Sequence, residues 1–264
     1  MALARKRFGQ HFLSDPGILR RIAAAVEAEA GDTVIEIGPG PGGLTAALAR
    51  SDVRLVAIEK DRDLVPGLRS RFPEARIIEG DALEFDWHEI AGPGPFRVVG
   101  NIPYNITSPL IEQALTPPRP RVVVFLVQRE VADRLAAPSG SGCYGALSVG
   151  VQAVAKVERL FTVPAGAFKP RPKVDSAVVR MTPLAEPLID DQEGAPFRRF
   201  VVGLFGFRRK QLGRGLRELT NAPPATVAVW LREAEIDDTA RAETLAPARF
   251  VRLFRIVWRE GVSG

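Results

Sequence analysis

The chain has 264 residues, of which 46% are hydrophobic and 25% are charged. These proportions are those of an ordinary folded protein, and they exclude a disordered chain or a small scaffold held by disulfides. The longest purely apolar run, Val122–Val127, is far shorter than the roughly 20 residues of a membrane-spanning helix. No apolar segment of a secretory signal follows the basic N-terminus, so we expect a cytoplasmic protein with no membrane partner.

Charge and metal-binding residues narrow the possible partners. One cysteine and two histidines are too few for a disulfide or a structural zinc site, so we expect no metal. The net charge of +5 favours a polyanionic partner. Basic residues form two clusters, Arg5-Lys6-Arg7 and Arg208-Arg209-Lys210, and the second lies in a stretch without acids from Arg198 to Arg217. Such a run is usually the solvated face of a helix, and contact with RNA is the alternative.

The first 180 residues alternate between strand-like and helix-like patterns. Asp15-Pro16 predicts a helix start, with Asp15 as N-cap and Pro16 in the first turn. Short β-branched runs then alternate with helix-length segments, which predicts parallel strands and crossover helices. The expected strands are 33–37, 54–58, 76–78, 96–99 and 121–127, and the expected helices include 43–50, 62–71 and 107–115. Two more β-rich stretches, 147–157 and 174–181, are expected to pair antiparallel at the sheet edge.

A change of pattern near residue 185 predicts a domain boundary. Residues 183–196 are acidic and contain prolines, as a linker does. Beyond them apolar residues follow helical spacing, with one face at Val227, Trp230, Leu231 and Ala234 and another at Phe250, Leu253, Phe254, Val257 and Trp258. We therefore predict an α/β domain over residues 1–185 and a small all-helical domain over residues 186–264.

A glycine-rich turn follows the first expected strand. Gly38, Gly40 and Gly42 would let the backbone approach a ligand closely. A dinucleotide-binding loop holds pyrophosphate on backbone N–H groups, but Pro39 and Pro41 remove two such donors. The loop therefore disfavours a nucleotide-dependent oxidoreductase, and a tight turn without a ligand is the alternative.

Acids follow the next two strands. Glu59 ends the second strand about 20 residues after the glycine loop, where a carboxylate can accept both hydroxyls of a ribose. Asp81 follows the third strand at the same edge of the sheet and can accept an adenine amine. Either acid alone is more often a cap or a solvated loop residue. Together with the glycine loop they predict an adenosine site.

The segment after the fourth strand carries the most chemical information. The Asn101 side-chain carbonyl and the Ile102 backbone carbonyl can accept both hydrogens of an aromatic amine, while Tyr104 stacks on its ring. An amine held in this way has its lone pair turned out of conjugation, as alkylation of adenine N6 requires. The alternative is an Asn-x-Pro turn with a core tyrosine.

Taken together, these motifs resemble the ribosomal RNA adenine dimethyltransferase family over nearly the whole chain. The similar segments are residues 6–13, 36–45, 80–83, 101–106, 168–179 and 207–212. The resemblance implies a Rossmann-like, S-adenosylmethionine-dependent methyltransferase domain with a mostly parallel sheet and a helical C-terminal domain. The implied substrate is a pair of adjacent adenosines in the 3′-terminal hairpin of small-subunit ribosomal RNA, converted to N6,N6-dimethyladenosine. It also implies the small ribosomal subunit as partner and a role in its assembly. We expect a monomer, because nothing in the sequence suggests an obligate dimer.

The resemblance also implies roles for individual residues. The implied catalytic residues are Asn101, Pro103, Tyr104 and Phe168, with Phe168 stacking on a flipped base opposite Tyr104. Those implied to bind the cofactor are Gln10, His11, Leu13, Gly38, Gly40, Glu59, Asp81, Ala82 and Asn101. The implied RNA contacts are Arg5, Lys6, Arg7, Arg208, Arg209 and Lys210. The family often has asparagine at the position of His11, so its backbone alone would serve the cofactor.

Two further hypotheses remain at this point. The related enzymes that modify one adenine of large-subunit ribosomal RNA share the Asn-x-Pro-Tyr pattern, although the glycine loop and residues 168–179 are more similar to the small-subunit group. A non-catalytic RNA-binding assembly factor with the same fold is the other hypothesis. The second hypothesis requires that catalytic activity has been lost. Against it stand the expected site residues Glu59, Asp81, Asn101 and Tyr104, which are all present.

Overall fold

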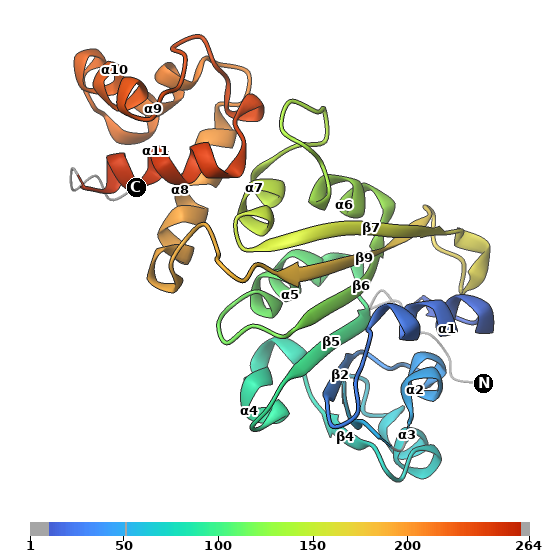
Figure 1. Ribbon diagram of the computed structural model, residues 1–264. Helices are drawn as coiled ribbons and strands as arrows, with labels where there is room; N and C mark the ends of the chain where they lie inside the picture. Colours follow the sequence, from blue (N-terminus) through green and yellow to red (C-terminus); the bar gives the residue numbers. More distant parts are fainter. Residues whose placement is uncertain (1–10, 51, 260–264) are drawn as a thin grey trace. The chain divides into compact units, whose positions relative to one another are not determined.

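The computed structural model describes residues 11–50 and 52–259, which form two compact units (Figure 1). The first unit contains the chain up to Ala132 together with Val157–Pro183, and the second contains Asp133–Lys156 and the chain from Leu184 onward. The division after Pro183 lies near the predicted boundary at 185. Residues 133–156 differ from the prediction, because Gly140 N–H and the Tyr144 hydroxyl donate hydrogen bonds to Glu243 O and Leu245 O, in the segment before the last helix.

The first unit is built on a mixed, mostly parallel sheet, which confirms the predicted fold class. Its strands lie in the order β4 (Arg76–Glu79), β3 (Arg54–Glu59), β2 (Thr33–Ile37), β5 (Phe96–Asn101), β6 (Val122–Gln128), β9 (Ser176–Pro183) and β7 (Ala155–Val163). The neighbouring strands β4, β3, β2, β5 and β6 run parallel. Strand β9 pairs antiparallel with β6, with Val179 opposite Phe125. The chain order reverses at β2, which has β3 on one side and β5 on the other. Ligands of open α/β sheets bind at such a point.

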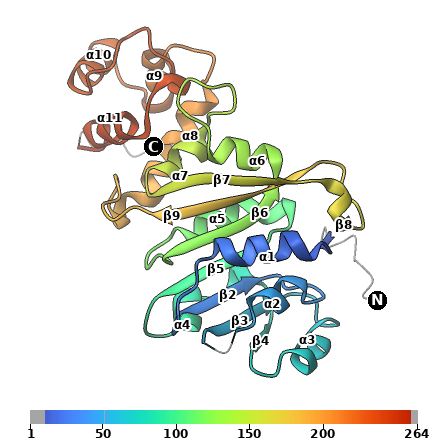
Figure 2. The same ribbon diagram turned by 45° about the vertical axis from the view of Figure 1, so that its right-hand side comes forward.

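Helices cover both faces of this sheet, as Figures 1 and 2 show. The helices α1 (Pro16–Ala25), α2 (Gly43–Leu48) and α3 (Val65–Arg71) cover one face, and α4 (Trp87–Ala91) and α5 (Thr107–Ala114) cover the other. Helix α1 begins as predicted, because Asp15 accepts a hydrogen bond from Ile18 N–H at 2.9 Å. Since both faces are covered, the central strands are buried at nearly every position rather than at alternate ones.

A short strand pair joins two segments that are far apart in the sequence. Strand β1 (Phe12–Leu13) pairs antiparallel with β8 (Phe168–Lys169), so that Leu13 lies opposite Phe168. Ser14 N–H donates to Ala167 O at 3.0 Å and extends the connection. The residues just before α1 are therefore held by the segment that precedes β9.

One expectation about local structure was wrong. Residues 147–152 lie in helix α7 (Ala146–Gln152) rather than in a strand, because the Ser148 hydroxyl accepts from Gly145 N–H in the first turn and donates to Arg134 O. The strand β7 begins only at Ala155. Trp258 shares the predicted face of its helix, because its ring centre lies 5.1 Å from that of Phe254, although its side chain is 47% exposed. Trp87 and His88 begin α4, with Asp86 as N-cap.

The second unit is helical, apart from the first residues of β7. Its main helices are α7, α8 (Gly194–Gly206), α9 (Leu212–Thr220), α10 (Pro224–Glu233) and α11 (Pro247–Arg259), with the end of α6 (Arg129–Leu135). Aromatic side chains of α8 and α11 form its centre, including Phe197, Phe200 and Phe254. Across residues 11–50 and 52–259, no helix is both long and apolar enough to cross a bilayer.

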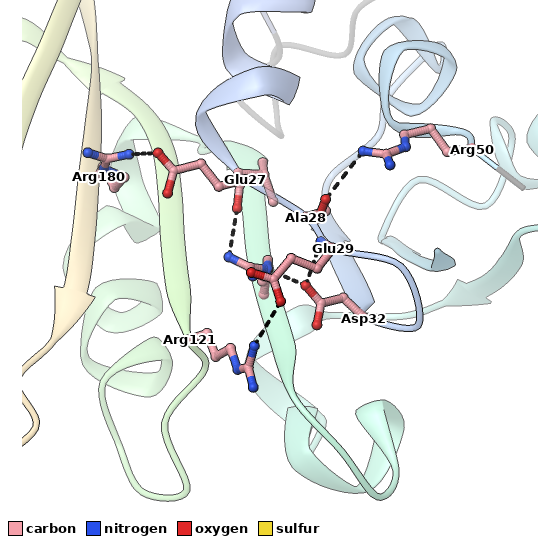
Figure 3. Close-up of polar contacts among 9 residues, drawn as sticks. Glu27, Ala28, Glu29, Asp32, Arg50, Arg121 and Arg180 are labelled. Carbon is pink, nitrogen blue, oxygen red and sulfur yellow. Dashed lines mark hydrogen bonds and ion pairs between the residues drawn. The ribbon is translucent and has the colours of Figure 1, made fainter. Parts of the chain in front are cut away.

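The amino edge of the sheet carries a network of ion pairs (Figure 3). Asp32, before β2, and Arg97, in β5, are both buried, and Arg97 Nε donates to Asp32 at 2.5 Å. Arg97 also donates to Val26 O at 3.1 Å, and the Asp32 carboxylate accepts from Glu29 N–H at 2.8 Å. Glu29 pairs with Arg121 at the surface. The network ties the end of α1 to two central strands.

Candidate active site

A cavity of about 240 Å³ lies at the carboxyl ends of β2, β3, β4 and β5. The structure brings most of the predicted site residues together in its lining: His11, Gly38, Gly40, Glu59, Asp81, Ala82, Asn101, Pro103 and Tyr104. Leu13 and Phe168 do not line it, and Gln10 lies outside the described residues. Residues from five separate segments therefore converge where the order of the strands reverses.

Glycine is needed at two positions beside the cavity. Gly40 has a φ of +57°, and a Cβ there would lie 3.0 Å from the Phe12 ring. At Gly100, near the end of β5, a Cβ would lie 2.6 Å from Ile37 O of β2. A side chain at either position would shift the walls of the cavity.

Glu59 connects the glycine loop to β3. Its two carboxylate oxygens accept hydrogen bonds from Gly40 N–H at 2.9 Å and from Asp61 N–H at 2.7 Å. The side chain is only 4% exposed, and burial raises its pKa above the ordinary value for glutamate. Each oxygen retains a second lone pair, so Glu59 can still accept hydroxyl hydrogens from a ligand in the cavity.

Asp81 carries an ion pair that the sequence analysis missed. The Lys60 ammonium contacts its Oδ2, and Leu83 N–H donates to its Oδ1 at 3.1 Å. Burial by itself would raise the pKa of Asp81, but the hydrogen bonds from Lys60 and Leu83 and the Lys60 charge lower it below the ordinary value. Lys60 also lines the cavity. Its place directly after Glu59 at a strand end was the signal that could have identified it.

The Asp81-Ala82 turn is fixed from behind by Trp87, which lies outside the predicted site residues. Trp87 is buried, and its indole N–H donates to Ala82 O at 2.8 Å. The Gln113 amide of α5 donates to the same oxygen at 3.1 Å and to Phe85 O at 2.7 Å. The turn therefore keeps its position without any ligand.

Asn101 and Tyr104 are both held by specific contacts. The Asn101 side-chain N–H donates to His11 O at 2.8 Å, which leaves its Oδ1 as the acceptor of the amide. The Tyr104 hydroxyl lies 3.1 Å from the Ser176 hydroxyl at the start of β9. Pro103 has extended backbone angles, and the Thr107 hydroxyl donates to its carbonyl at 3.1 Å. An acceptor oxygen and an aromatic ring therefore lie next to each other at the cavity wall.

Phe168 occupies a different place from the one implied by the resemblance. Its side chain is 3% exposed and packs in the hydrophobic core with Leu13, Leu19 and Leu44. In this arrangement its ring does not lie in the cavity with Tyr104. Stacking on a base stays a prediction for Phe168 and requires the ring to leave this core.

Glu36 is a buried acid that the sequence analysis did not place in the site. It is fully buried in β2, and burial together with the nearby Glu59 charge raises its pKa to about 8. Its Oε2 has no hydrogen-bond partner within the described residues. A cavity of about 30 Å³ lies beside it, lined also by Gly38, Gly40 and Asn101, which is room for one water molecule.

The C-terminal basic cluster is partly balanced by acids. Arg208 pairs with Glu243 and donates to Gly142 O at 2.9 Å, and Lys210 pairs with Glu218 at 3.3 Å. The sequence stretch holds no acid, but folding brings acids from outside it, so our interpretation that nothing balances the cluster was wrong. Arg209 is exposed. The cluster Arg5-Lys6-Arg7 lies outside the described residues.

Comparison with known proteins identifies the family. The model of the ribosomal RNA adenine dimethylase family matches residues 1–258. This chain belongs to that family. The predicted enzyme class is therefore confirmed: the protein is an S-adenosylmethionine-dependent ribosomal RNA adenine dimethyltransferase.

Relatives and solved structures agree with this assignment. The chain is 45% identical to a ribosomal RNA small subunit methyltransferase A of Acidithiobacillus ferrooxidans over 98% of this chain and 96% of the relative. It is 46% identical to that of Pseudomonas aeruginosa over 95% and 93%. A dimethyladenosine transferase from Plasmodium falciparum superposes with a TM-score of 0.83 at 25% identity, covering 96% of this chain and 99% of that one. The 23S rRNA methyltransferase ErmE superposes with a TM-score of 0.73 at 29% identity, covering 93% and 98%.

The cavity suits S-adenosylmethionine. It has carboxylates at the ends of two successive strands, as an adenosine moiety needs, and a glycine loop whose backbone lines the wall beside them. The buried Glu59 carboxylate faces this cavity with lone pairs to spare, and the turn at Asp81 is already fixed. The residues present therefore fit the cofactor that the family uses.

Proposed function

We propose that this protein methylates N6 of two adjacent adenosines in the 3′-terminal hairpin of small-subunit ribosomal RNA and produces N6,N6-dimethyladenosine. The observation that carries the choice of subunit is the 45–46% identity to small-subunit methyltransferases over nearly the full chain. The similarity to the 23S rRNA methyltransferase ErmE is lower, at 29% identity. The large-subunit alternative is therefore the less supported one.

Residues of the cavity divide into those that would hold the cofactor and those that would hold the base. Glu59 would accept the ribose hydroxyls, and Asp81 with Ala82 would hold the adenine. Gly38 and Gly40 would lie against the methionine portion. The proposal rests on their common position at the carboxyl edge of the sheet. The cofactor, when bound, supplies an electrophilic methyl group on a sulfonium.

Asn101 is the centre of the proposed chemistry. Its amide N–H is already bonded to His11 O, so Oδ1 is oriented to accept a hydrogen from the target amine. A second acceptor, the Ile102 carbonyl, would take the other hydrogen and turn the lone pair of N6 out of the ring. Proline at 103 favours an extended backbone at Ile102, which supports this arrangement. Tyr104 would stack on the base, with its ring held at Ser176.

No side chain needs to donate or abstract a proton in this step. Attack on a sulfonium is an in-line displacement with a neutral thioether as leaving group, so positioning and electrostatics provide the catalysis. The ammonium formed on N6 is acidic and loses its proton to water. The acids Glu59 and Asp81 accordingly serve binding rather than proton transfer.

We assign RNA contact to the second unit and to the N-terminal basic cluster. We propose that the protein acts as a monomer on ribosomal subunits in the cytoplasm. Within the C-terminal cluster Arg209 is exposed, whereas Arg208 is committed to Glu243 and Gly142 O. Arg209→Gln should therefore weaken subunit binding and lower its salt dependence by about one counterion. Arg217→Gln, also exposed and on α9, is the matched control for a general loss of charge. An equal effect of both changes would contradict a specific role for Arg209.

Methyl transfer to ribosomal subunits tests the proposed reaction. Labelled S-adenosylmethionine is supplied with small subunits that lack the hairpin modification, and modified nucleotides are mapped by mass spectrometry. We expect dimethyladenosine at two adjacent positions. Transfer to large-subunit RNA instead would establish the alternative substrate, and tight subunit binding without transfer would establish a non-catalytic assembly factor.

A role in small-subunit assembly can be separated from catalysis. Glu59→Ala should lose the cofactor, because the carboxylate proposed to hold the ribose is removed. We expect this variant to bind immature small subunits as tightly as the parent, measured by co-sedimentation. Weaker binding would contradict a separate assembly role.

A further inference from the structure

The side chain of His11 has contacts that cofactor binding does not explain. Its ring lies face to face with the Tyr104 ring, with centres 5.8 Å apart and planes inclined by 28°. Its Nδ1 lies 2.8 Å from Pro170 O, and because a carbonyl only accepts, Nδ1–H is the donor. The backbone carbonyl of His11, not its ring, receives the Asn101 amide. The ring is therefore directed toward the place proposed for the target base.

A flipped adenine has two faces, and stacking on both lowers the cost of leaving its own helix. Tyr104 offers one face. The second face implied by the family resemblance is Phe168, but that ring is buried in the core and does not line the cavity. His11 does line the cavity and lies nearly parallel to Tyr104.

We infer that His11 is the second stacking face for the target adenine, a specificity-determining contact of this chain. The inference rests on the proposed function, because it takes Tyr104 as the first stacking face. A base between two rings needs at least about 7 Å between their centres, because each ring must stay in stacking contact with the base. The observed 5.8 Å is at least about 1 Å too short, so the two rings touch each other in this structure and separate when the base enters.

The surrounding contacts decide which ring moves. The Tyr104 hydroxyl is held near the buried Ser176, and Thr107 fixes the carbonyl of Pro103 just before it. His11 is held at Pro170 O, which belongs to the segment right after β8. Pro170 is exposed, so the His11 ring can shift with it while the His11 carbonyl stays bonded to Asn101. The opening therefore occurs on the His11 side, while Tyr104 stays in place.

Three substitutions separate stacking from the hydrogen bond. His11→Ala removes both the ring and the donor, His11→Phe keeps a ring without the donor, and His11→Gln keeps a donor without the ring. Each variant is assayed for methyl transfer to unmodified small subunits at saturating S-adenosylmethionine. The cofactor Kd is measured without RNA, together with the melting temperature. Tyr104→Ala serves as the reference for loss of the first face.

If His11 stacks on the base, kcat/KM for the subunit should fall about tenfold in His11→Ala and in His11→Gln, and stay within about twofold of the parent in His11→Phe. The cofactor Kd should change less than about twofold in all three, because the backbone carbonyl is retained. If His11→Gln kept the parent kcat/KM and His11→Phe did not, the inference would be overturned, and the hydrogen bond to Pro170 O would be the role of His11. Unchanged or increased turnover in His11→Ala would overturn it as well. If Tyr104→Ala also behaved as the parent, the proposed stacking site itself would be wrong, not only the role of His11.

Discussion

The two edges of the central sheet handle charge in opposite ways. At the amino edge, buried Asp32 meets the guanidinium of Arg97, and hydrogen bonds from Arg97 and Glu29 reach its carboxylate. At the carboxyl edge, Glu36 and Glu59 lie buried near each other. Among the described residues that line the cavity, Lys60 is the only lysine or arginine. The first arrangement stabilises the fold. The second keeps acceptor capacity for a ligand.

The pKa values express this difference. Burial would raise the pKa of Asp32, but the Glu29 hydrogen bond and the Arg97 guanidinium outweigh it, so the pKa is lowered. Burial raises the pKa of Glu36 to about 8, and no cation among the described residues reverses the effect. A lowered carboxylate pKa contributes stability above the unfolded value, whereas a raised one removes stability as pH rises. At neutral pH Glu36 and Glu59 therefore lower the stability of the fold, whereas Asp32 at the amino edge adds to it.

The largest expected effect is at the amino edge. Arg97→Leu should lower the free energy of unfolding by about 4 kcal/mol, because it leaves the Asp32 carboxylate buried without a counter-charge. Urea denaturation at pH 7 measures this. The double variant Asp32→Asn/Arg97→Leu removes both charges and should recover at least half of the loss, with cofactor affinity unchanged. A cost below about 1 kcal/mol for the single variant would show that the network does not stabilise this edge.

Glu36→Gln should raise the free energy of unfolding, and the gain should depend on pH. In the parent, Glu36 holds its proton up to about pH 8 when folded but loses it near 4.5 when unfolded, so its contribution to stability declines between these values. Glutamine does not titrate. The variant should therefore gain stability relative to the parent by about 1 kcal/mol per pH unit from pH 5 upward, to at most about 3 kcal/mol. Asp32, with a lowered pKa, adds no slope in this range. Parallel stability curves for parent and variant would contradict the assignment to Glu36.

Much of this comparison could be predicted from the sequence, and the rest depended on folding. Glu59, Asp81 and Asn101 were predicted because strand ends meet at one edge, a rule that needs only chain order. The Phe168 side chain could not be placed, since its burial depends on the pairing of β8 with β1 across 155 residues of chain. The strand prediction for residues 147–152 was wrong, because the alternating Leu147, Val149 and Val151 fit a strand as well as a buried helix. The ion pair of Arg208 with Glu243 could not be predicted, because folding brings these distant residues together.

Asp81→Asn tests whether the carboxyl edge binds ligand through its charge. The asparagine carbonyl can keep the hydrogen bond from Leu83 N–H, but its amide nitrogen replaces the oxygen that would accept the adenine amine. The affinity for S-adenosylmethionine should fall at least tenfold, measured by calorimetry. Stability should change by less than about 1 kcal/mol, because the lost ion pair with the exposed Lys60 is a weak one. A large loss of stability with unchanged affinity would reverse the roles of the two edges.

The smallest expected effect is at Lys60, which lies on the same Asp81 oxygen that the adenine amine would use. Lys60→Met keeps the aliphatic chain and removes the charge, so the oxygen becomes free and the cationic sulfonium is no longer repelled. Affinity for S-adenosylmethionine should rise about two- to threefold at low salt, with a smaller change for S-adenosylhomocysteine, which lacks the sulfonium charge. The gain should shrink as salt increases, because the side chain is 56% exposed and its charge is screened. A weaker affinity for both ligands would instead show that the ammonium itself binds the adenosine portion, so that this edge, like the amino edge, relies on a cation.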